Sequence, residues 1–134
     1  EEQLTMVAYN FKPQFAPLVE AGEKRQTIRA MGKRRHANPG EALQLYTGQR
    51  TRQCRKLLDA TCAEATPIII RMDPDKGLDI KLYGQWLPTF AELEAFAFAD
   101  GFGRNTGEAI DEFIRFFEGR LEADNCFHGV LIKW

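Results

Sequence analysis

One short segment, Gly22-Glu23-Lys24-Arg25-Gln26-Thr27-Ile28-Arg29, decides how this chain is organised. Its glycine ends a predicted helix, and its second half is predicted to be a short strand. On such a strand Lys24 and Thr27 are three positions apart and would face opposite sides. A bend near Arg25 is therefore needed to bring both side chains into one site, and a glycine at the end of a helix can supply it.

Strand and helix signals continue on both sides of this segment. The predicted strands cover residues 5–10, 26–29, 42–46, 54–72, 79–82 and 127–133, with the fourth being either one long bent strand or two short strands broken near Pro67. The predicted helices cover residues 13–21, residues 89–100 and a third segment opened by Asn105 and Glu108, whose phenylalanines form one apolar face. This order predicts a single α+β domain over residues 1–134, a small mixed or barrel-like sheet with helices packed outside it.

Composition is that of an ordinary globular domain, with 134 residues, 44% hydrophobic and 28% charged. The three cysteines are odd in number and lack CxxC spacing, so we expect reduced thiols and neither a disulfide framework nor a bound metal. No apolar run approaches the ~20 residues of a membrane-spanning helix, and residues 1–3 are acidic or polar, unlike a secretory leader. These observations predict a cytoplasmic protein that does not enter a membrane.

Charge is distributed unevenly along the chain. Residues 1–56 hold eleven basic and five acidic side chains, whereas residues 57–134 hold seven basic and fourteen acidic ones. This asymmetry suggests a polyanionic partner for one face, although the two halves would also neutralise each other if they packed together. The run Lys33-Arg34-Arg35-His36 lies in a predicted loop, where charges rarely have fixed internal partners, and this favours an exposed basic surface.

Several catalytic classes lack their residues. The sequence contains neither GxxxxGK[ST] nor GxGxxG, and its two histidines, His36 and His128, have no recognisable nucleophile nearby in sequence. Hydride transfer and nucleotide hydrolysis are thereby disfavoured, and we expect no cofactor.

Four segments, taken in order, resemble the ASCH family, a branch of the PUA-like superfamily, in versions found in phage and prophage genomes. They are the G-x-K-x-x-T-x-R element (Gly22, Lys24, Thr27, Arg29), the turn and strand of residues 39–46, Ala99-Asp100-Gly101-Phe102, and the final residues 127–134. The resemblance implies a PUA-like barrel of about six strands flanked by three helices. It also implies a cleft that takes RNA or a nucleoside.

The resemblance further implies two functions. Related PUA domains bind RNA, and one small bacterial branch hydrolyses N4-acetylcytidine with the lysine and threonine of the KxxT element and a glutamate near the end of the following helix. Lys24 and Thr27 match the first two of these residues, and Asp100 falls at the third, one methylene shorter. The leading hypothesis is an RNA- or nucleic-acid-binding module, the alternative is a pyrimidine nucleoside amidohydrolase, and a phage protein that binds an acidic host protein is a third reading.

The nucleic-acid hypothesis assigns phosphate contacts to the basic residues of the first half and base stacking to aromatic side chains. The candidate contacts are Arg25, Arg29, Lys33, Arg34, Arg35, Arg50, Arg52 and Arg55, with Tyr46, Phe102 or Trp86 as stacking residues. If the basic side chains are mostly paired with the acidic second half of the chain, the hypothesis fails.

The amidohydrolase hypothesis assigns the nucleophile to Thr27, the base to Lys24 and the acid to Asp100. As a base, Lys24 needs its pKa lowered from about 10.4 to near 7, at a cost of about 4 kcal/mol. Burial and the neighbouring cations Arg25 and Arg29 lower that pKa, whereas an ionised Asp100 raises it. A lysine that stays charged would instead be a phosphate or carbonyl contact.

Overall fold

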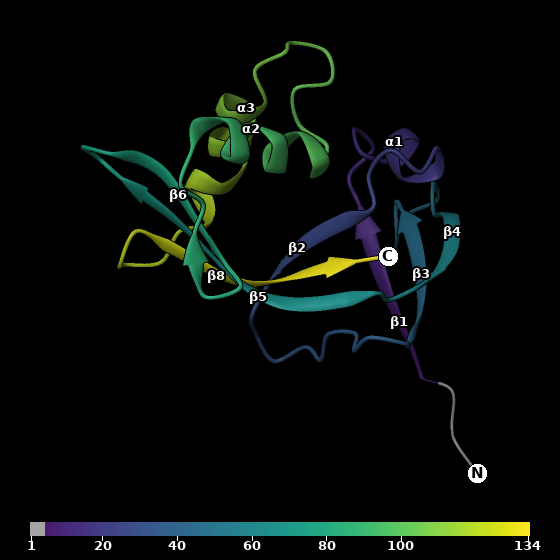
Figure 1. The fold of residues 1–134 in the computed structure, drawn as a ribbon. Coiled ribbons are helices and arrows are strands. Elements are labelled where there is room, and N and C mark those ends of the chain that lie inside the picture. Colours follow the sequence, from purple (N-terminus) through teal and green to yellow (C-terminus); the bar gives the residue numbers. More distant parts are fainter. Residues whose placement is uncertain (1–4) are drawn as a thin grey trace.

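Eight strands and three α-helices make up residues 5–134, the part of the chain that the structure, a computed structural model, describes (Figure 1). The strands are β1 (Met6–Phe11), β2 (Gln26–Ala30), β3 (Ala42–Thr47), β4 (Arg55–Thr61), β5 (Glu64–Asp73), β6 (Gly77–Leu82), β7 (Gln85–Trp86) and β8 (Cys126–Lys133). The helices are α1 (Ala16–Glu20), α2 (Phe90–Ala99) and α3 (Ala109–Phe117), the last continuing into a 3₁₀ turn, η1 (Glu118–Arg120). Residues 1–3, whose acidic and polar character argued against a secretory leader, lie outside the described residues.

The strands form two sheets rather than one closed barrel. The first has the order β1-β3-β4, with β1 parallel and β4 antiparallel to β3. The second has the order β2-β8-β5-β6-β7 and is antiparallel throughout. The α+β class is therefore confirmed. The barrel of about six strands is not confirmed, because no ladder joins the two sheets within residues 5–134.

The segment predicted as one long bent strand or two strands broken near Pro67 forms two strands, but the position of the break is wrong. The chain breaks instead at Cys62 and Ala63, between β4 and β5, and Pro67 lies inside β5. Proline lacks an N–H and is tolerated where a strand has a neighbour on one side only. Here Pro67 pairs with Val130 of β8, while the pairing of β5 with β6 begins one residue later, at Ile68.

The second helix begins and ends where its sequence predicts. Thr89 caps α2 by accepting a hydrogen bond from the backbone N–H of Glu92 at 3.2 Å. The helix ends at Asp100, where Gly101 takes a positive φ of 105°. Asp100 is thus held at the carboxyl end of a well-defined helix.

The predicted start of the third helix at Asn105 is wrong. Helix α3 begins at Ala109, and Thr106 rather than Asn105 bonds its first turn, accepting from the N–H of Glu108 and donating to the Glu112 carboxylate. The predicted apolar face is confirmed, since Phe113 and Phe117 are buried. No helix of residues 5–134 is long and apolar enough to cross a membrane.

A cluster of phenylalanines joins α3 to the start of the chain. The ring of Phe102 packs edge-on against Phe15, Phe113 and Phe116, with centroid separations of 5.4 to 5.5 Å. Because Phe102 follows Asp100 by two residues, this packing fixes the end of α2 beside the segment that leads into β2.

Candidate active site

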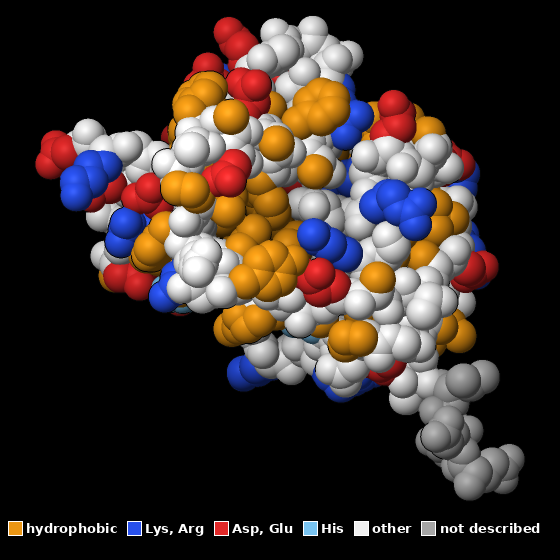
Figure 2. All heavy atoms as spheres, viewed as in Figure 1, with side chains coloured by type: hydrophobic (Ala, Val, Ile, Leu, Met, Phe, Trp, Pro, Cys, Tyr) orange, Lys and Arg blue, Asp and Glu red, His pale blue; other side chains and the backbone are white. Residues whose placement is uncertain are grey.

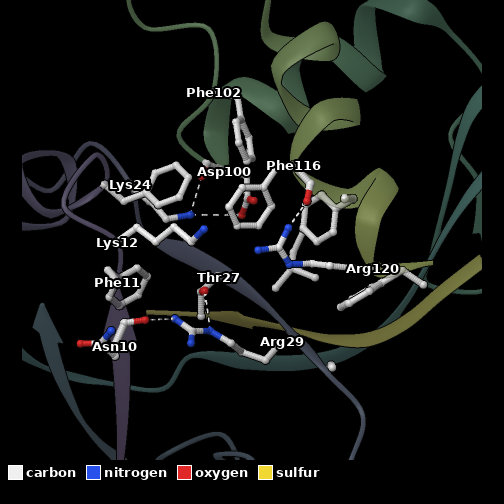
Figure 3. A pocket seen from close by; sticks show the side chains of 15 residues that line it. Asn10, Phe11, Lys12, Lys24, Thr27, Arg29, Asp100, Phe102, Phe116 and Arg120 are labelled. Carbon is white, nitrogen blue, oxygen red and sulfur yellow. Dashed lines mark hydrogen bonds and ion pairs between the residues drawn. The ribbon is translucent and has the colours of Figure 1, made fainter. Parts of the chain in front are cut away.

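The three side chains that the family resemblance implies as a site line one pocket, with Asp100 joining Lys24 and Thr27 from a distant part of the chain (Figure 3). Lys24 comes from the connection between α1 and β2, Thr27 from β2 and Asp100 from the end of α2. All three are buried, with Lys24 and Asp100 each only 3% exposed. The pocket has a volume of about 270 Å³ and is otherwise lined mainly by phenylalanines and cations.

The chain bends at Gly22, just before Lys24. Gly22 has a φ of 74°, and the next two backbone N–H groups, of Glu23 and Lys24, both donate to the carbonyl of Leu18 at 2.9 and 3.0 Å. This turn carries the chain from α1 into β2. Lys24 lies in this connection, before β2 begins at Gln26, so the alternation of a strand does not separate it from Thr27 and both line the same pocket.

Lys24 and Asp100 form a buried pair with several contacts. The Lys24 ammonium lies 3.4 Å from Asp100 Oδ1 and also donates to the backbone carbonyl of Asp100. Gln26 Nε2 donates to the same Oδ1 at 3.2 Å. This one carboxylate oxygen thus accepts from both neighbours.

Burial shifts the pKa values of Lys24 and Asp100 in opposite directions. Burial lowers the pKa of Lys24, opposed by the charge of Asp100, and burial raises the pKa of Asp100, opposed by the charge of Lys24. Both shifts favour the uncharged forms. In its uncharged form the Lys24 amine has two N–H groups, which the backbone carbonyl and Oδ1 of Asp100 can accept, and one lone pair that is left for the pocket.

Arg29 holds the hydroxyl of Thr27. Its Nε donates to Thr27 Oγ1 at 2.9 Å, and its second terminal nitrogen donates to the carbonyl of Asn10 at 2.8 Å. Burial lowers the pKa of Arg29 to about 10, with Arg34 adding to the effect, so Arg29 stays charged at neutral pH. Since Arg29 donates to the hydroxyl oxygen, the hydroxyl proton of Thr27 is free to turn toward another acceptor.

The pocket also holds side chains that sequence reasoning missed. Lys12, which follows β1, and Arg120, in η1, both line it together with Phe116 of α3. Lys12 Nζ lies 5.2 Å and Arg120 Cζ 4.0 Å from the centre of the Phe116 ring. Their meeting depends on the tertiary fold, which brings η1 and the residue after β1 to one pocket, and no local signal in the sequence reports that.

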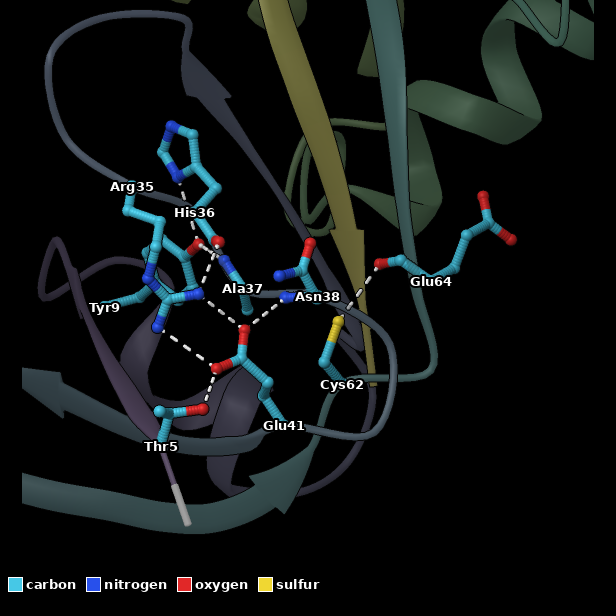
Figure 4. A network of polar contacts seen from close by, with 9 residues as sticks. All are labelled: Thr5, Tyr9, Arg35, His36, Ala37, Asn38, Glu41, Cys62 and Glu64. Atoms are coloured by element: carbon cyan, nitrogen blue, oxygen red, sulfur yellow. Dashed lines mark hydrogen bonds and ion pairs between the residues drawn. The ribbon is translucent and has the colours of Figure 1, made fainter. Parts of the chain in front are cut away.

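The basic loop between β2 and β3 is held more firmly than predicted. Glu41 accepts two hydrogen bonds from Arg35, at 2.7 and 3.0 Å, and one from the N–H of Asn38 at 2.7 Å (Figure 4). These bonds, with Arg35 as the main cause, lower the pKa of Glu41 to about 2. Arg35 is thus a structural partner of Glu41, and the expectation that this loop's charges lack fixed partners is wrong for it.

The same loop is fastened to β1 by Tyr9. The Tyr9 hydroxyl lies 3.0 Å from His36 Nδ1 and accepts from the backbone N–H of Ala37 at 3.1 Å. His36 Nε2 lies 2.9 Å from the carbonyl of Ala30, so Nε2 carries the proton and Nδ1 accepts from Tyr9. Arg34 also donates to the carbonyl of Ala8.

The remaining predicted nucleic-acid contacts separate into paired and unpaired cations. Arg55 forms an ion pair with Glu20 at 2.6 Å, and Arg25 donates to the backbone carbonyl of Trp134 at 3.1 Å. Of the predicted contacts, those that make no ion pair with a described carboxylate are Arg25, Arg29, Lys33, Arg34, Arg50 and Arg52. The acidic partners of Arg35 and Arg55 both lie in the first half of the chain, so the two halves do not neutralise these cations.

Two of the three predicted stacking residues are engaged elsewhere. Phe102 is 2% exposed, within the phenylalanine cluster. Trp86 lies on β7 with Arg71 4.1 Å from its ring centre, and it does not line the pocket. Tyr46 is half-buried on β3 and donates to Gln44 at 3.3 Å. Phe116 is the half-buried ring that faces the pocket, and it becomes the better stacking candidate.

One group of side chains has the composition of a metal site. Asp124, Cys126 and His128 lie together at the start of β8, away from the residues that line the pocket. His128 Nε2 lies 3.0 Å from Asp124 Oδ2, and this hydrogen bond raises the pKa of His128. The hydrogen bond between His128 and Asp124 explains why these side chains lie close together, and no metal ion is needed to explain it.

Comparison with known proteins adds no relative. No family model, no curated protein and no solved structure matches this chain. The functional argument therefore depends on the pocket and on the residues that form it.

Proposed function

We propose that this chain is an ASCH-type protein of PUA-like fold that hydrolyses the acyl amide of an N4-modified cytosine nucleoside. The observation that carries the proposal is the buried Lys24–Asp100 pair in the same pocket as the Arg29-bound hydroxyl of Thr27. A volume of about 270 Å³ lies just below the ~300–1,000 Å³ of typical small-molecule sites. Such a pocket suits one nucleotide unit.

The three side chains have complementary roles in this reaction. Thr27 Oγ1 attacks the acyl carbonyl carbon while the neutral amine of Lys24 takes the hydroxyl proton. Asp100, in its protonated form, donates its proton to the exocyclic nitrogen as the C–N bond breaks, which releases cytidine. The acyl group is left as an ester on Thr27.

Water completes the cycle. It attacks the ester carbon, its proton passes to the Asp100 carboxylate, and the Lys24 ammonium returns a proton to Thr27 as the C–O bond breaks. The acid is released and all three side chains regain their starting forms. The opposed pKa directions of Lys24 and Asp100 support this assignment, because a base needs a lowered pKa and an acid a raised one.

Thr27→Val tests this proposal. Valine keeps the β-branched shape that suits strand β2 but removes the nucleophile, so hydrolysis of N4-acetylcytidine should fall at least about 10³-fold. Chromatography of the released cytidine measures it. Thr61→Val, an exposed threonine of β4, is the matched control and should keep full activity. Turnover by Thr27→Val at the wild-type rate would exclude Thr27 as the nucleophile.

RNA binding is the second candidate function, favoured by exposed cations near the pocket. Asn10 lines the pocket, and its side chain accepts from the backbone N–H of Gln49, in the loop that carries Arg50 and Arg52. Arg29 and Arg34 both lie over the ring of Tyr9, at 5.1 and 4.8 Å from its centre. Figure 2 shows the basic side chains of the viewed face in separate small groups, however, which is why we rank this function second.

Lys33→Ala/Arg50→Ala/Arg52→Ala tests the RNA proposal without disturbing the Arg35–Glu41 pair. If these cations bind phosphates, the dependence of log K on log salt for single-stranded RNA should weaken by about 2, near 0.7 for each phosphate that is no longer neutralised. Fluorescence anisotropy at several salt concentrations measures the slope. Lys76→Ala/Lys81→Ala/Arg115→Ala removes the same charge elsewhere and should leave the slope unchanged. An unchanged slope in the first variant would contradict RNA binding by this surface.

A further inference from the structure

The pocket holds more positive charge than the proposed reaction uses. Four basic side chains line it, Lys12, Lys24, Arg29 and Arg120, and Asp100 is its one acidic side chain. Lys24 pairs with Asp100, and Arg29 bonds Thr27 and Asn10. Lys12 and Arg120 therefore remain as two cations without an assigned role.

These two cations point into the same space. Figure 3 shows the Lys12 amine and the Arg120 guanidinium between the Phe116 ring and the Thr27–Arg29 pair. Neither forms an ion pair with any carboxylate of residues 5–134. Arg120 uses one terminal nitrogen to donate to the Phe116 carbonyl, which leaves most of its N–H donors free.

Two exposed cations that line one pocket can bind the same anion. Lys12 offers a compact charge with three donors, and Arg120 offers a planar fork that fits the oxygens of a phosphate. Both side chains are exposed at the pocket, whereas Lys24 and Asp100 are buried within it. The acylated nucleobase of a ligand would then occupy the buried part of the pocket, and a charged group of the same ligand would occupy the exposed part.

We infer that Lys12 and Arg120 bind the phosphate of the substrate, so that the site takes a phosphorylated pyrimidine nucleotide in preference to a free nucleoside. The base would lie toward Lys24 and Asp100, with the ring of Phe116 beside the phosphate-binding cations. This inference rests on the proposed function for the position of the base. The phosphate belongs either to a free nucleotide or to one nucleotide of an RNA strand.

Calorimetric titration of the whole chain with cytidine, cytidine 5′-monophosphate and inorganic phosphate tests the inference. We expect the monophosphate to bind at least about tenfold more tightly than cytidine, as one charge-assisted contact of ~1.4 kcal/mol would give. Lys12→Met and Arg120→Met should each remove about tenfold of the monophosphate affinity and leave the cytidine affinity unchanged. Lys76→Met, in the turn between β5 and β6, and Arg115→Met, on the exposed side of α3, are the matched controls and should change neither.

A short oligocytidylate without a terminal phosphate distinguishes the two sources. Affinity that depends on Lys12 and Arg120 for this ligand supports a nucleotide within RNA, and dependence for the monophosphate alone supports a free nucleotide. Equal affinity for cytidine and its monophosphate, failure of both to bind, or binding of inorganic phosphate alone would overturn the inference. A preference for the monophosphate without any hydrolysis would contradict the proposed function and leave the phosphate site standing. Hydrolysis without that preference would contradict the phosphate site and leave the proposed function standing.

Discussion

Lys24→Met is expected to destabilise the fold by about 3 kcal/mol at neutral pH, because it leaves the Asp100 carboxyl buried without its partner. In a domain of this size the midpoint of thermal unfolding should fall by roughly 10–15 °C. Circular dichroism during heating, together with urea denaturation, measures the change. The same variant should lose hydrolysis of N4-acetylcytidine, since methionine has no lone pair of comparable basicity.

The stability that Lys24→Met loses should also depend on pH, and the titration of Asp100 decides whether the loss grows or shrinks as the pH rises. Burial already raises the pKa of Asp100 above its unfolded value near 3.9, and the charge of Lys24 opposes that shift, so the folded pKa rises further when Lys24 is removed. Folding then requires a proton, so the variant is least affected at about pH 4 and loses stability as the pH rises from the unfolded pKa toward the folded one. A loss that is the same at all pH values would contradict an unpaired carboxyl.

The double variant Lys24→Met/Asp100→Asn separates stability from chemistry. Asparagine carries no charge and keeps an oxygen that Gln26 can bond, so much of the lost stability should return. Activity should stay absent, because both the base and the acid are gone. If Lys24→Met alone is as stable as the wild type at neutral pH, the buried pair is not formed as described.

The three candidate site residues could be named from the sequence because the resemblance that implies them lies in short local segments. Lys24 and Thr27 share one short element with Gly22, and Asp100 stands directly before the glycine that ends α2. The helix cap at Thr89 and the turn after β5 are local in the same sense. Such signals act within a few residues, where propensity and turn chemistry decide the structure.

The rest of the pocket could not be predicted because it is assembled by packing. Lys12 and Arg120 come from opposite ends of the chain, and only the tertiary fold brings both to the ring of Phe116 in one pocket. The same holds for Pro67, since a sequence does not report where β6 begins to pair with β5. Arg35 is different: Glu41 is six residues away, and a loop closed by this ion pair could have been anticipated.

Gly101→Ala is expected to cost about 2–3 kcal/mol, through both backbone strain and crowding. Gly101 has a φ of 105°, and a Cβ there would lie 2.9 Å from the ring of Phe15 and 3.1 Å from Cδ of Lys24. The ring belongs to the phenylalanine cluster and cannot yield easily, whereas Lys24 can move only by lengthening its contacts with Asp100. Weaker cytidine binding should therefore accompany the loss of stability.

Gly107→Ala is the matched control, since it shares the strain without the crowding. Gly107 has a φ of 75°, and a Cβ there meets nothing within 4 Å, so only the ~1 kcal/mol of a left-handed alanine is expected. Urea denaturation of both variants gives the difference, which reports how closely α2 approaches Phe15 and Lys24. Equal losses of unfolding free energy in the two variants would mean that Lys24 does not pack against the end of α2. Contacts with other residues would then have to position its amine beside Asp100.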